Sequence, residues 1–519
     1  MATKLNSKNL DMYNLDKEET LWLYNGLDCA ITYELYDMLK PQLQPATSGR
    51  TYNFTRAMLG PAMSMMTTGL RVDWIAVLKA LEGDPDATEI KEQKGLFERH
   101  LDLGGMKKKK GKWVIENEDA LFQRLAKNIS GDVVNFHSPL QLQKFFYETL
   151  SIAPITTFKQ GKHRVTTDRE ALEKVVEKYP RGEVAARCLL RLRDIESTID
   201  ILEKDLDDDG RFRCSFNVVG TETGRWASRK SAFNRGTNLQ NITKELRHIF
   251  IPDDGYVMFE ADLEQAESRV VAYLSGDQAY IDACEGGDLH ADVAQMVFSL
   301  QPNQVHNTYY RQFTYRDMAK RAGHGTNYRL TPRSLANHMH IQVKQAYDFN
   351  LRYLGGGMIY EDAERMKLTG IPHDREGDVC IFPGAFPGIR HWHEDVDMAL
   401  MDEGSLVTAF GRERMFWERP EDPATQREAT AYEPQSTVSD LTCLGIWKIW
   451  DKYEGNAINV LANGHDAVMG QVREDKVVEM NEAIPRLMEN PLTYSGRKML
   501  IPVEIGFGPN WRDVKCLEL

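Results

Sequence analysis

The sequence contains no run of about eighteen consecutive apolar residues, and its first stretch, Met1 to Leu10, is polar. We therefore expect neither a membrane span nor a signal peptide, and no membrane partner. The seven cysteines form no Cys-x-x-Cys pair and no spacing typical of a disulfide framework. This usage fits a reducing compartment and argues against structural zinc, so we expect a cytoplasmic location, in the host cell if the source is viral.

Internal repeats and low-complexity segments are also absent. A chain of 519 residues is too long for one compact core, so several subdomains are expected. The net charge of −13 does not favour nucleic-acid binding, although the field at a site depends on how charge is distributed. Two local basic clusters occur, at Lys107–Lys110 and at Lys159–Arg164. Each is either a solvated loop or a contact for a polyanion.

Apolar periodicity divides the chain into a helical region, a mixed region, a second helical region and a return to mixed structure. Such an order implies a discontinuous central domain in an α+β fold. The expected elements in chain order are helices from about Thr51 to Lys204 interrupted at the lysine run and at Thr156–Thr167, strands at Arg211–Val219 and Tyr256–Ala261, helices from Leu263 to Leu354, a Gly-, Pro- and Asp-rich stretch to about Pro387, a helix around Ser439–Tyr453, a hairpin with its turn near Gly464, and an extended tail.

Two aspartates far apart in the chain are candidates for a divalent-metal site. Asp262 follows the predicted strand Tyr256–Ala261, and Asp466 lies at the tip of the predicted hairpin. A hairpin can bring the two carboxylates together, and such a pair can hold two cations about 4 Å apart for nucleotidyl transfer. Each residue also has an ordinary interpretation, since an acidic residue after a strand is commonly a helix N-cap and His-Asp at a turn is commonly structural.

A predicted helix carries cations and rings at every fourth position. Steps of four drift only about 40° around a helix, so the side chains form one stripe with a cationic end for a triphosphate and a ring-bearing end for stacking. A solvated basic face is the alternative, yet Gly323 and Gly325 inside the helix are costly unless something approaches closely. The stripe consists of Arg316, Lys320, His324 and Tyr328.

Upstream of these elements lie Thr221-Glu222-Thr223-Gly224-Arg225 and Asn238-Leu239-Gln240-Asn241-Ile242. A glycine-supported arginine beside amide side chains can grip a nucleic-acid backbone and minor-groove acceptors without reading sequence. Alone, this signal is weak.

The four elements, in this order and spacing, resemble the family A DNA polymerases, which include bacterial DNA polymerase I and many phage replicases. The resemblance extends from about Trp22 almost to the C-terminus. It implies a right-hand fold with an antiparallel palm sheet and a helical thumb and fingers. Further matching segments are Gly69–Asp73, His137–Leu142, Asp288–His290, Phe386–Gly388, Phe410–Arg412, Gln435, Asp440 and Gly506–Trp511.

The resemblance also implies a division of the chain. Its parts are a remnant of a 3′–5′ exonuclease domain at 1–48, the start of the palm at 49–82, the thumb at 83–205, the palm with motif A at 206–277, the fingers with motif B at 278–395 including an insertion at about 355–384, and the palm with motif C at 396–519. We expect this insertion to be structural or partner-binding rather than a metal site.

By resemblance, Asp262 and Asp466 hold two Mg²⁺ ions, which Mn²⁺ could replace, with help from the Leu263 carbonyl, and Lys320 joins them in catalysis. Glu267 matches the position that crowds a ribose 2′-hydroxyl and so selects deoxynucleotides. The implied nucleotide-binding residues are Arg316, His324, Tyr328, Glu267, His290 and Gln265. The implied DNA-binding residues are Arg225, Gln240, Asn241, Gln435, Arg427 and His465.

Five positions depart from the family pattern. His324 stands where Phe or Tyr is usual in the family. Arg329 replaces the Gly that usually follows the tyrosine matched by Tyr328. Ala467 replaces a Glu beside the metal-binding aspartate, which removes one carboxylate. Ala431 and Ser436 replace the usual Asn and Gly near Gln435.

The segment Tyr24-x-x-x-Asp28 resembles the last motif of the proofreading exonuclease, but the chain has no room for that domain's earlier motifs. A nuclease needs several carboxylates around its metals, so we predict no proofreading in cis. The missing part either is a separate polypeptide or has been removed. The expected partners are primer–template DNA and deoxynucleoside triphosphates, with a separate exonuclease or a processivity factor as further candidates.

The sequence therefore predicts a template-directed DNA polymerase of phage or plasmid replication, with bacterial repair synthesis as the second role. Two alternatives stay open. A single-subunit RNA polymerase shares the palm and its aspartates, but Glu267 argues against it because that position must be small to admit a 2′-hydroxyl. An inactive nucleic-acid-binding protein is disfavoured because Asp262, Asp466, Arg316 and Lys320 are intact.

Overall fold

A four-stranded antiparallel sheet forms the centre of the molecule in the computed structural model. The model describes residues 16–73, 106–109, 112–115, 117–159, 162–203, 206–231, 235–242, 244–310, 313–339, 341–368 and 371–517. The strand order is β18 (Ile458–Asn463), β19 (Ala467–Arg473), β10 (Tyr256–Leu263) and β22 (Val503–Gly508). Apolar side chains of these strands are buried in the largest core of the described chain. The predicted α+β class and its antiparallel sheet are confirmed.

The strand that carries Asp262 is longer than predicted. Asp262 pairs with Ala467 on one side and with Glu504 on the other, and Leu263 pairs with Val503. Because neighbours on both sides satisfy its backbone, β10 continues through Asp262 instead of ending before it. The predicted hairpin is confirmed, since β18 and β19 flank Asp466.

Helices pack around this sheet. α3 (Leu59–Thr68) and α17 (Pro423–Tyr453) lie against β18, and α18 (Val477–Met488) lies against β10 and β22. The helix predicted around Ser439–Tyr453 begins much earlier, at Pro423, where Asp422 accepts a hydrogen bond from Ala424 N and caps the N-terminus. α18 interrupts the expected extended tail, because its buried Met480, Ile484 and Met488 recur at helical spacing.

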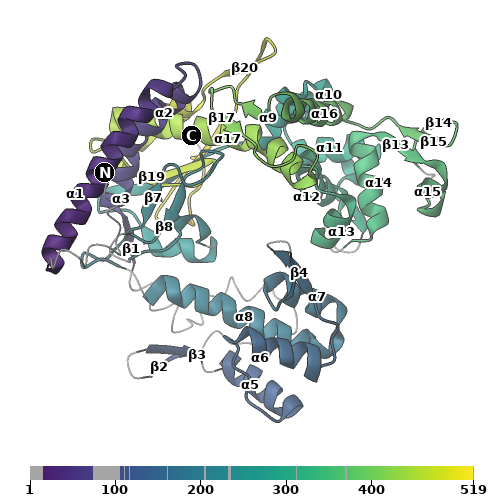
Figure 1. Cartoon of the computed structure of the whole chain (residues 1–519), viewed down its shortest axis with the longest axis horizontal. Helices are drawn as coiled ribbons and strands as arrows, with labels where there is room; N and C mark the ends of the chain where they lie inside the picture. The colour runs from purple at the N-terminus through teal and green to yellow at the C-terminus, as the bar shows by residue number, and fades with distance from the viewer. Residues whose placement is uncertain are drawn as a thin grey trace, which may run out of the picture.

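A second core lies beside the sheet and consists of helices. These helices are α9 (Ala266–Ser275), α10 (Gln278–Glu285), α11 (Leu289–Phe298), α12 (Tyr315–Asn327), α13 (Pro332–Met339), α14 (Val343–Leu354) and α16 (Pro387–Asp402). α11 packs on α12, and α16 packs on both α9 and α17. Figure 1 shows this group to the right of the sheet; α10 to α14 lie within the range 278–395 that was predicted for the fingers.

The upstream helices form a third group, drawn below the sheet in Figure 1. They are α5 (Asn117–Ser130), α6 (Pro139–Gln143), α7 (Arg169–Lys178) and α8 (Pro180–Glu203). The described residues of the two basic clusters lie on paired strands rather than on irregular loops, β2 (Met106–Lys109) with β3 (Lys112–Ile115), and β4 (Thr156–Lys159) with β5 (Lys162–Val165). In each, the paired lysines are separated by two residues, the second a glycine, and such short connections favour hairpins.

The strand predicted over Arg211–Val219 is two strands in different sheets. β6 (Arg211–Phe212) pairs with β1 (Leu70–Val72), whereas β7 (Ser215–Asn217) pairs with β8 (Ala227–Arg229). Between them Gly236 lies so close that a Cβ there would come 1.9 Å from the Arg213 carbonyl oxygen. Because the backbone at Gly236 lies against Arg213, the predicted strand is interrupted between β6 and β7.

An extra subdomain lies within residues 355–384. β13 (Gly356–Ile359), β15 (Val379–Phe382) and β14 (Asp374–Glu376) form a sheet in that order, with α15 (Tyr360–Arg365) beside it. A small core that includes Leu368, Ile371 and Cys380 stabilises it. Figure 1 shows this subdomain at the end of the molecule farthest from α1.

α1 (Lys17–Leu39) carries the exonuclease-like Tyr24 and Asp28, and both are exposed. Asp16 caps this helix by accepting hydrogen bonds from Glu18 N and Glu19 N. No helix among the described residues is long and apolar enough to cross a membrane. The remaining elements are α2 (Ser48–Ala57), β9 (Phe250–Ile251), β11 (Thr308–Tyr310), β12 (Phe313–Thr314), β16 (Ser405–Val407), β17 (Glu413–Met415), β20 (Leu492–Tyr494), β21 (Arg497–Met499) and short turns of 3-10 or π helix.

Candidate active site

Asp262 and Asp466 meet at one end of the sheet. Leu263 N, at the end of β10, donates a 3.1 Å hydrogen bond to the Asp466 carbonyl in the β18–β19 turn. The turn itself is held by Gly464 N, which donates to the Ala467 carbonyl at 2.8 Å, and by His465 N, which donates to Asn463 Oδ1 at 3.0 Å. His465 has a φ of 76°, in the left-handed region. Backbone bonds therefore bring the two predicted metal-binding aspartates together.

The electrostatics of this pair favour a cation. Burial, followed by repulsion from Asp466, Glu260 and Glu504, raises the pKa of Asp262 to about 7. Burial also raises the pKa of Asp466. A hard divalent cation with oxygen ligands would remove this penalty, so the donor set fits Mg²⁺. No group of three or more His, Cys, Asp or Glu side chains suited to a metal occurs in the described residues.

Glu504 is a residue that the sequence interpretation missed. It pairs directly with Asp262 across β10 and β22, so the two side chains lie on the same face of the sheet. Its Oε1 accepts a 3.4 Å hydrogen bond from the Cys516 thiol. Alternation in the final strand could have indicated its face, but not which strand it would join.

Glu267 is held between two other predicted site residues. Tyr328 Oη donates to Glu267 Oε2 at 2.5 Å, and Arg225 Nη2 forms an ion pair with Glu267 Oε1. Burial, followed by the charge of Glu267, raises the pKa of Tyr328 well above its ordinary value. The network connects the Thr221–Arg225 segment, α9 and the C-terminal end of α12.

Arg316 forms a two-bond ion pair with Asp288, at 2.8 Å through Nε and 3.1 Å through Nη2. Asp288 also caps α11, and Arg316 lowers the pKa of its carboxyl. Burial lowers the pKa of His290, and the charges of Arg316 and Lys320 lower it further. Lys320 is exposed. α12 thus presents Arg316 and Lys320 where the resemblance places the triphosphate, and α11 brings Asp288 and His290 beside them.

The predicted stripe on α12 is present, and one of its two glycines has a steric explanation within the chain. Lys320 and His324 are exposed while Ala319 and Ala322 are buried. The rings of His324 and Tyr328 lie edge to face, with centroids 5.1 Å apart. A Cβ at Gly325 would come 2.8 Å from Leu330, so the expected close approach occurs there and is made by the chain itself, whereas a Cβ at Gly323 would make only ordinary contact with Tyr353.

The predicted DNA-binding residues differ in their surroundings. Gln240 Nε2 donates to the carbonyls of Trp226 at 3.2 Å and Asn463 at 3.3 Å, so this side chain stabilises the β18–β19 hairpin that carries Asp466. Asn241 is exposed, Gln435 is half-buried on α17, and Arg427 is exposed near the start of that helix. Gln265 precedes α9 with a left-handed φ of 52°. Their roles toward DNA or nucleotide, and that of the Leu263 carbonyl, remain predictions.

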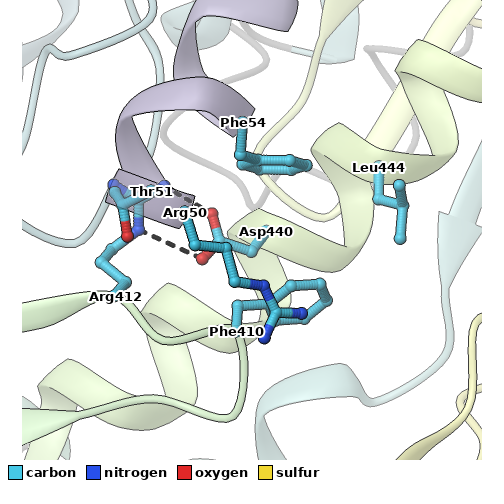
Figure 2. A pocket seen from close by; sticks show the side chains of 7 residues that line it. All are labelled: Arg50, Thr51, Phe54, Phe410, Arg412, Asp440 and Leu444. Atoms are coloured by element: carbon cyan, nitrogen blue, oxygen red, sulfur yellow. Dashed lines mark hydrogen bonds and ion pairs between the residues drawn. The ribbon is translucent and has the colours of Figure 1, made fainter. Parts of the chain in front are cut away.

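A buried ion pair between Arg412 and Asp440 packs against the segment that carries Arg225. Arg412 donates to Asp440 through Nε at 3.1 Å and Nη2 at 2.6 Å, and the Asp440 side chain is only 2% exposed. A Cβ at Gly224 would come 2.6 Å from the Arg412 guanidinium carbon, and Ser439 Oγ donates to the Gly224 carbonyl at 3.1 Å. Figure 2 shows this pair in a hollow lined by α2, α17 and the segment after β16. The sequence matches at Arg412 and Asp440 gave no indication of this role.

Comparison with known proteins agrees with this geometry. The sequence profile of DNA polymerase family A matches residues 109–356 and 379–513. The unmatched residues between them lie within the extra subdomain at 355–384. DNA polymerase I of Thermus filiformis is 27% identical over 402 residues, covering 75% of this chain and 43% of that protein. DNA polymerase I of Chloroflexus aurantiacus is 26% identical over 413 residues, covering 75% of this chain and 38% of that protein.

The chain thus spans less than half the length of these curated relatives. Among solved structures, the POL domain of Pol1 from M. smegmatis, in complex with a DNA primer–template and dNTP, matches with a TM-score of 0.63. The match has 23% sequence identity and covers 88% of this chain and 70% of that chain. The right-hand polymerase fold is confirmed by this likeness. Because the family profile matches well over half of its residues, the chain belongs to DNA polymerase family A.

Proposed function

We propose that this protein is a template-directed DNA polymerase that adds deoxynucleotides to a primer 3′ end by two-metal-ion nucleotidyl transfer. The meeting of Asp262 and Asp466 at the end of the sheet carries the proposal, since the Leu263–Asp466 backbone bond holds the two residues together and each carboxyl has a raised pKa that a bound cation would lower. Family membership supports the same activity.

Each side chain has a role in this reaction. Asp262 and Asp466 hold the two cations, which when bound lower the pKa of the primer hydroxyl and neutralise the leaving pyrophosphate. Arg316 exchanges Asp288 for the triphosphate, because its planar fork suits phosphate oxygens as well as a carboxylate. Lys320 is exposed and offsets charge on the pyrophosphate or donates a proton to it. Glu267, fixed by Tyr328 and Arg225, excludes the ribose 2′-hydroxyl.

Primer extension tests this function directly. The full chain is incubated with a primed DNA template, Mg²⁺ and either deoxynucleotides or ribonucleotides, with a reaction containing a chelator as control. We expect templated extension with deoxynucleotides that requires the metal, and much weaker extension with ribonucleotides because Glu267 blocks the sugar. Comparable extension with ribonucleotides would indicate an RNA polymerase, and no extension with either Mg²⁺ or Mn²⁺ would contradict the proposal.

We further predict that the chain does not proofread. Asp28 lies on the exposed helix α1, and nuclease chemistry needs several carboxylates around its metals. A primer with a mismatched, labelled 3′ end should therefore keep its full length when incubated with the chain and Mg²⁺ alone. Progressive trimming that persists in the Asp28→Ala variant after repurification would reveal a contaminating nuclease, whereas trimming abolished by that substitution would refute the prediction.

The proposed partners follow from the same function. Primer–template DNA and deoxynucleoside triphosphates are the substrates, and a separate exonuclease polypeptide or a processivity factor is a candidate accessory protein. The exposed Tyr24 on α1 supports a partner at that end of the chain. We propose that the protein serves phage or plasmid DNA replication in the cytoplasm, of the host cell if it is viral.

A further inference from the structure

Arg329 occupies a position where its backbone conformation is unfavourable. It follows Tyr328 at the end of α12 and has a φ of 57°, in the left-handed region where glycine is the usual residue. Arg329 N donates to the Thr326 carbonyl at 3.1 Å, and Leu330 N donates to the Gly325 carbonyl at 2.8 Å, so this conformation closes the helix end. A non-glycine residue with a large side chain persists there only if other contacts compensate.

The compensating contacts are made by α16. Arg329 Nη1 pairs with Asp397 Oδ2 at 2.9 Å, and Arg329 Nη2 donates to the His393 carbonyl. The two side chains of the ion pair are 17% and 26% exposed, so both are partly shielded from water. The buried His393 ring adds a contact from Nε2 to the Asn327 carbonyl at 2.9 Å. α16 therefore holds the backbone and a side chain on both sides of Tyr328.

α16 is itself held against α9 and α10. Gly388 N, in its first turn, donates to Asp277 Oδ2 at 2.8 Å, and Asp277 caps α10. α16 also packs on α9, the helix that carries Glu267. The contact between Arg329 and Asp397 thus joins the end of α12, through α16, to α9, which carries Glu267. Tyr328 lies at this junction and donates its 2.5 Å hydrogen bond to Glu267.

We propose that Arg329 is a positioning residue for sugar selection: its ion pair with Asp397 fixes Tyr328 against Glu267 and so strengthens discrimination against ribonucleotides. This inference rests on the proposed polymerase function and on Glu267 as the residue that excludes the 2′-hydroxyl. A carboxylate fixed on one oxygen by Arg225 and on the other by Tyr328 cannot turn away from a ribose. Without the contact between Arg329 and α16, the Tyr328 hydroxyl moves more freely, and the Glu267 carboxylate can then shift away from the sugar.

The test compares the parent chain with Arg329→Gly. This substitution relieves the strain of the left-handed backbone conformation and removes the ion pair with Asp397. Single-nucleotide insertion kinetics give kcat/KM for a deoxynucleotide and for its ribonucleotide counterpart on one primer–template. We expect the ratio of the two to fall about tenfold, the size expected from weakening one hydrogen bond to a charged group. The deoxynucleotide kcat/KM should stay within about twofold of the parent value, because the metal and triphosphate ligands are unchanged.

Two further variants separate positioning from general damage. Arg333→Ala removes an exposed arginine at the start of α13 and should leave the ratio unchanged. Tyr328→Phe deletes the hydroxyl on Glu267 and should lower the ratio by itself, after which Arg329→Gly should add little, because both changes act through one contact.

Three results would overturn the inference. One is an unchanged ratio in Arg329→Gly, and a second is an equal loss for both nucleotides accompanied by a lower Tm. The third is a full additional effect of Arg329→Gly in the Tyr328→Phe background. Failure of the parent chain to extend any primer would instead overturn the proposed function and this inference with it.

Discussion

Replacing Asp466 with alanine is expected to abolish templated primer extension while leaving the fold intact. The Asp466 carboxylate is half of the proposed metal site, and loss of a metal-binding carboxylate should lower the rate on the order of a thousandfold or more. Stability should not fall, because the Asp466 carboxylate repels Asp262 and contributes to the raised pKa of that residue. Removing one of two neighbouring like charges relieves this repulsion in the metal-free protein.

The measurement is the extension rate at saturating Mg²⁺, together with the Tm of the metal-free chain. Asp475→Ala is the matched control, since Asp475 lies just past the same hairpin, is exposed and pairs only with Arg473 among the described residues. We expect full activity in this control. Extension by Asp466→Ala at more than a tenth of the parent rate would contradict the assignment, and so would inactivity explained by a large fall in Tm.

Among the substitutions proposed for this chain, Asp440→Ala is expected to cause the largest loss of stability. The change leaves the Arg412 guanidinium buried without its partner, and breaking a buried ion pair in this way costs about 3–5 kcal/mol. Extension should fall as well, because Arg412 lies directly under Gly224 and thereby supports Arg225. The effect on activity is thus indirect and should appear mainly in DNA binding.

Thermal unfolding and primer–template affinity test this expectation. Asp451→Ala, an exposed aspartate on the same helix, serves as the control and should change neither quantity. The double variant Arg412→Met with Asp440→Leu replaces the pair with apolar side chains and should recover part of the lost stability. A Tm for Asp440→Ala within about 1 °C of the parent would show that the pair contributes little.

Much of the candidate site could be predicted from sequence because its residues follow local rules. The apolar strand before Asp262 and the short hairpin around Asp466 each specify their own conformation, and both were confirmed. The fourfold spacing from Arg316 to Tyr328 likewise needs only helix geometry. The resemblance to family A polymerases then predicted roles for these local elements.

Other features depended on partners distant in sequence. β10 extends through Asp262 because β19 and β22 pair with it, and α18 forms in a tail that was expected to be extended. Gln240, whose role toward DNA stays a prediction, also braces through its amide the hairpin that carries Asp466. Periodicity cannot predict such pairings, because many distant segments offer equivalent hydrogen-bond donors and acceptors.

The sequence by itself determined the family, the mixed fold, and the identity of the aspartates and the cationic helix. Only the tertiary structure decided how these parts are held: Glu504 beside Asp262, Arg412 with Asp440 beneath Gly224, and Arg329 tied to Asp397. The physical reason is that helix and hairpin geometry are short-range, whereas an ion pair depends on which segments the core brings within a few ångströms.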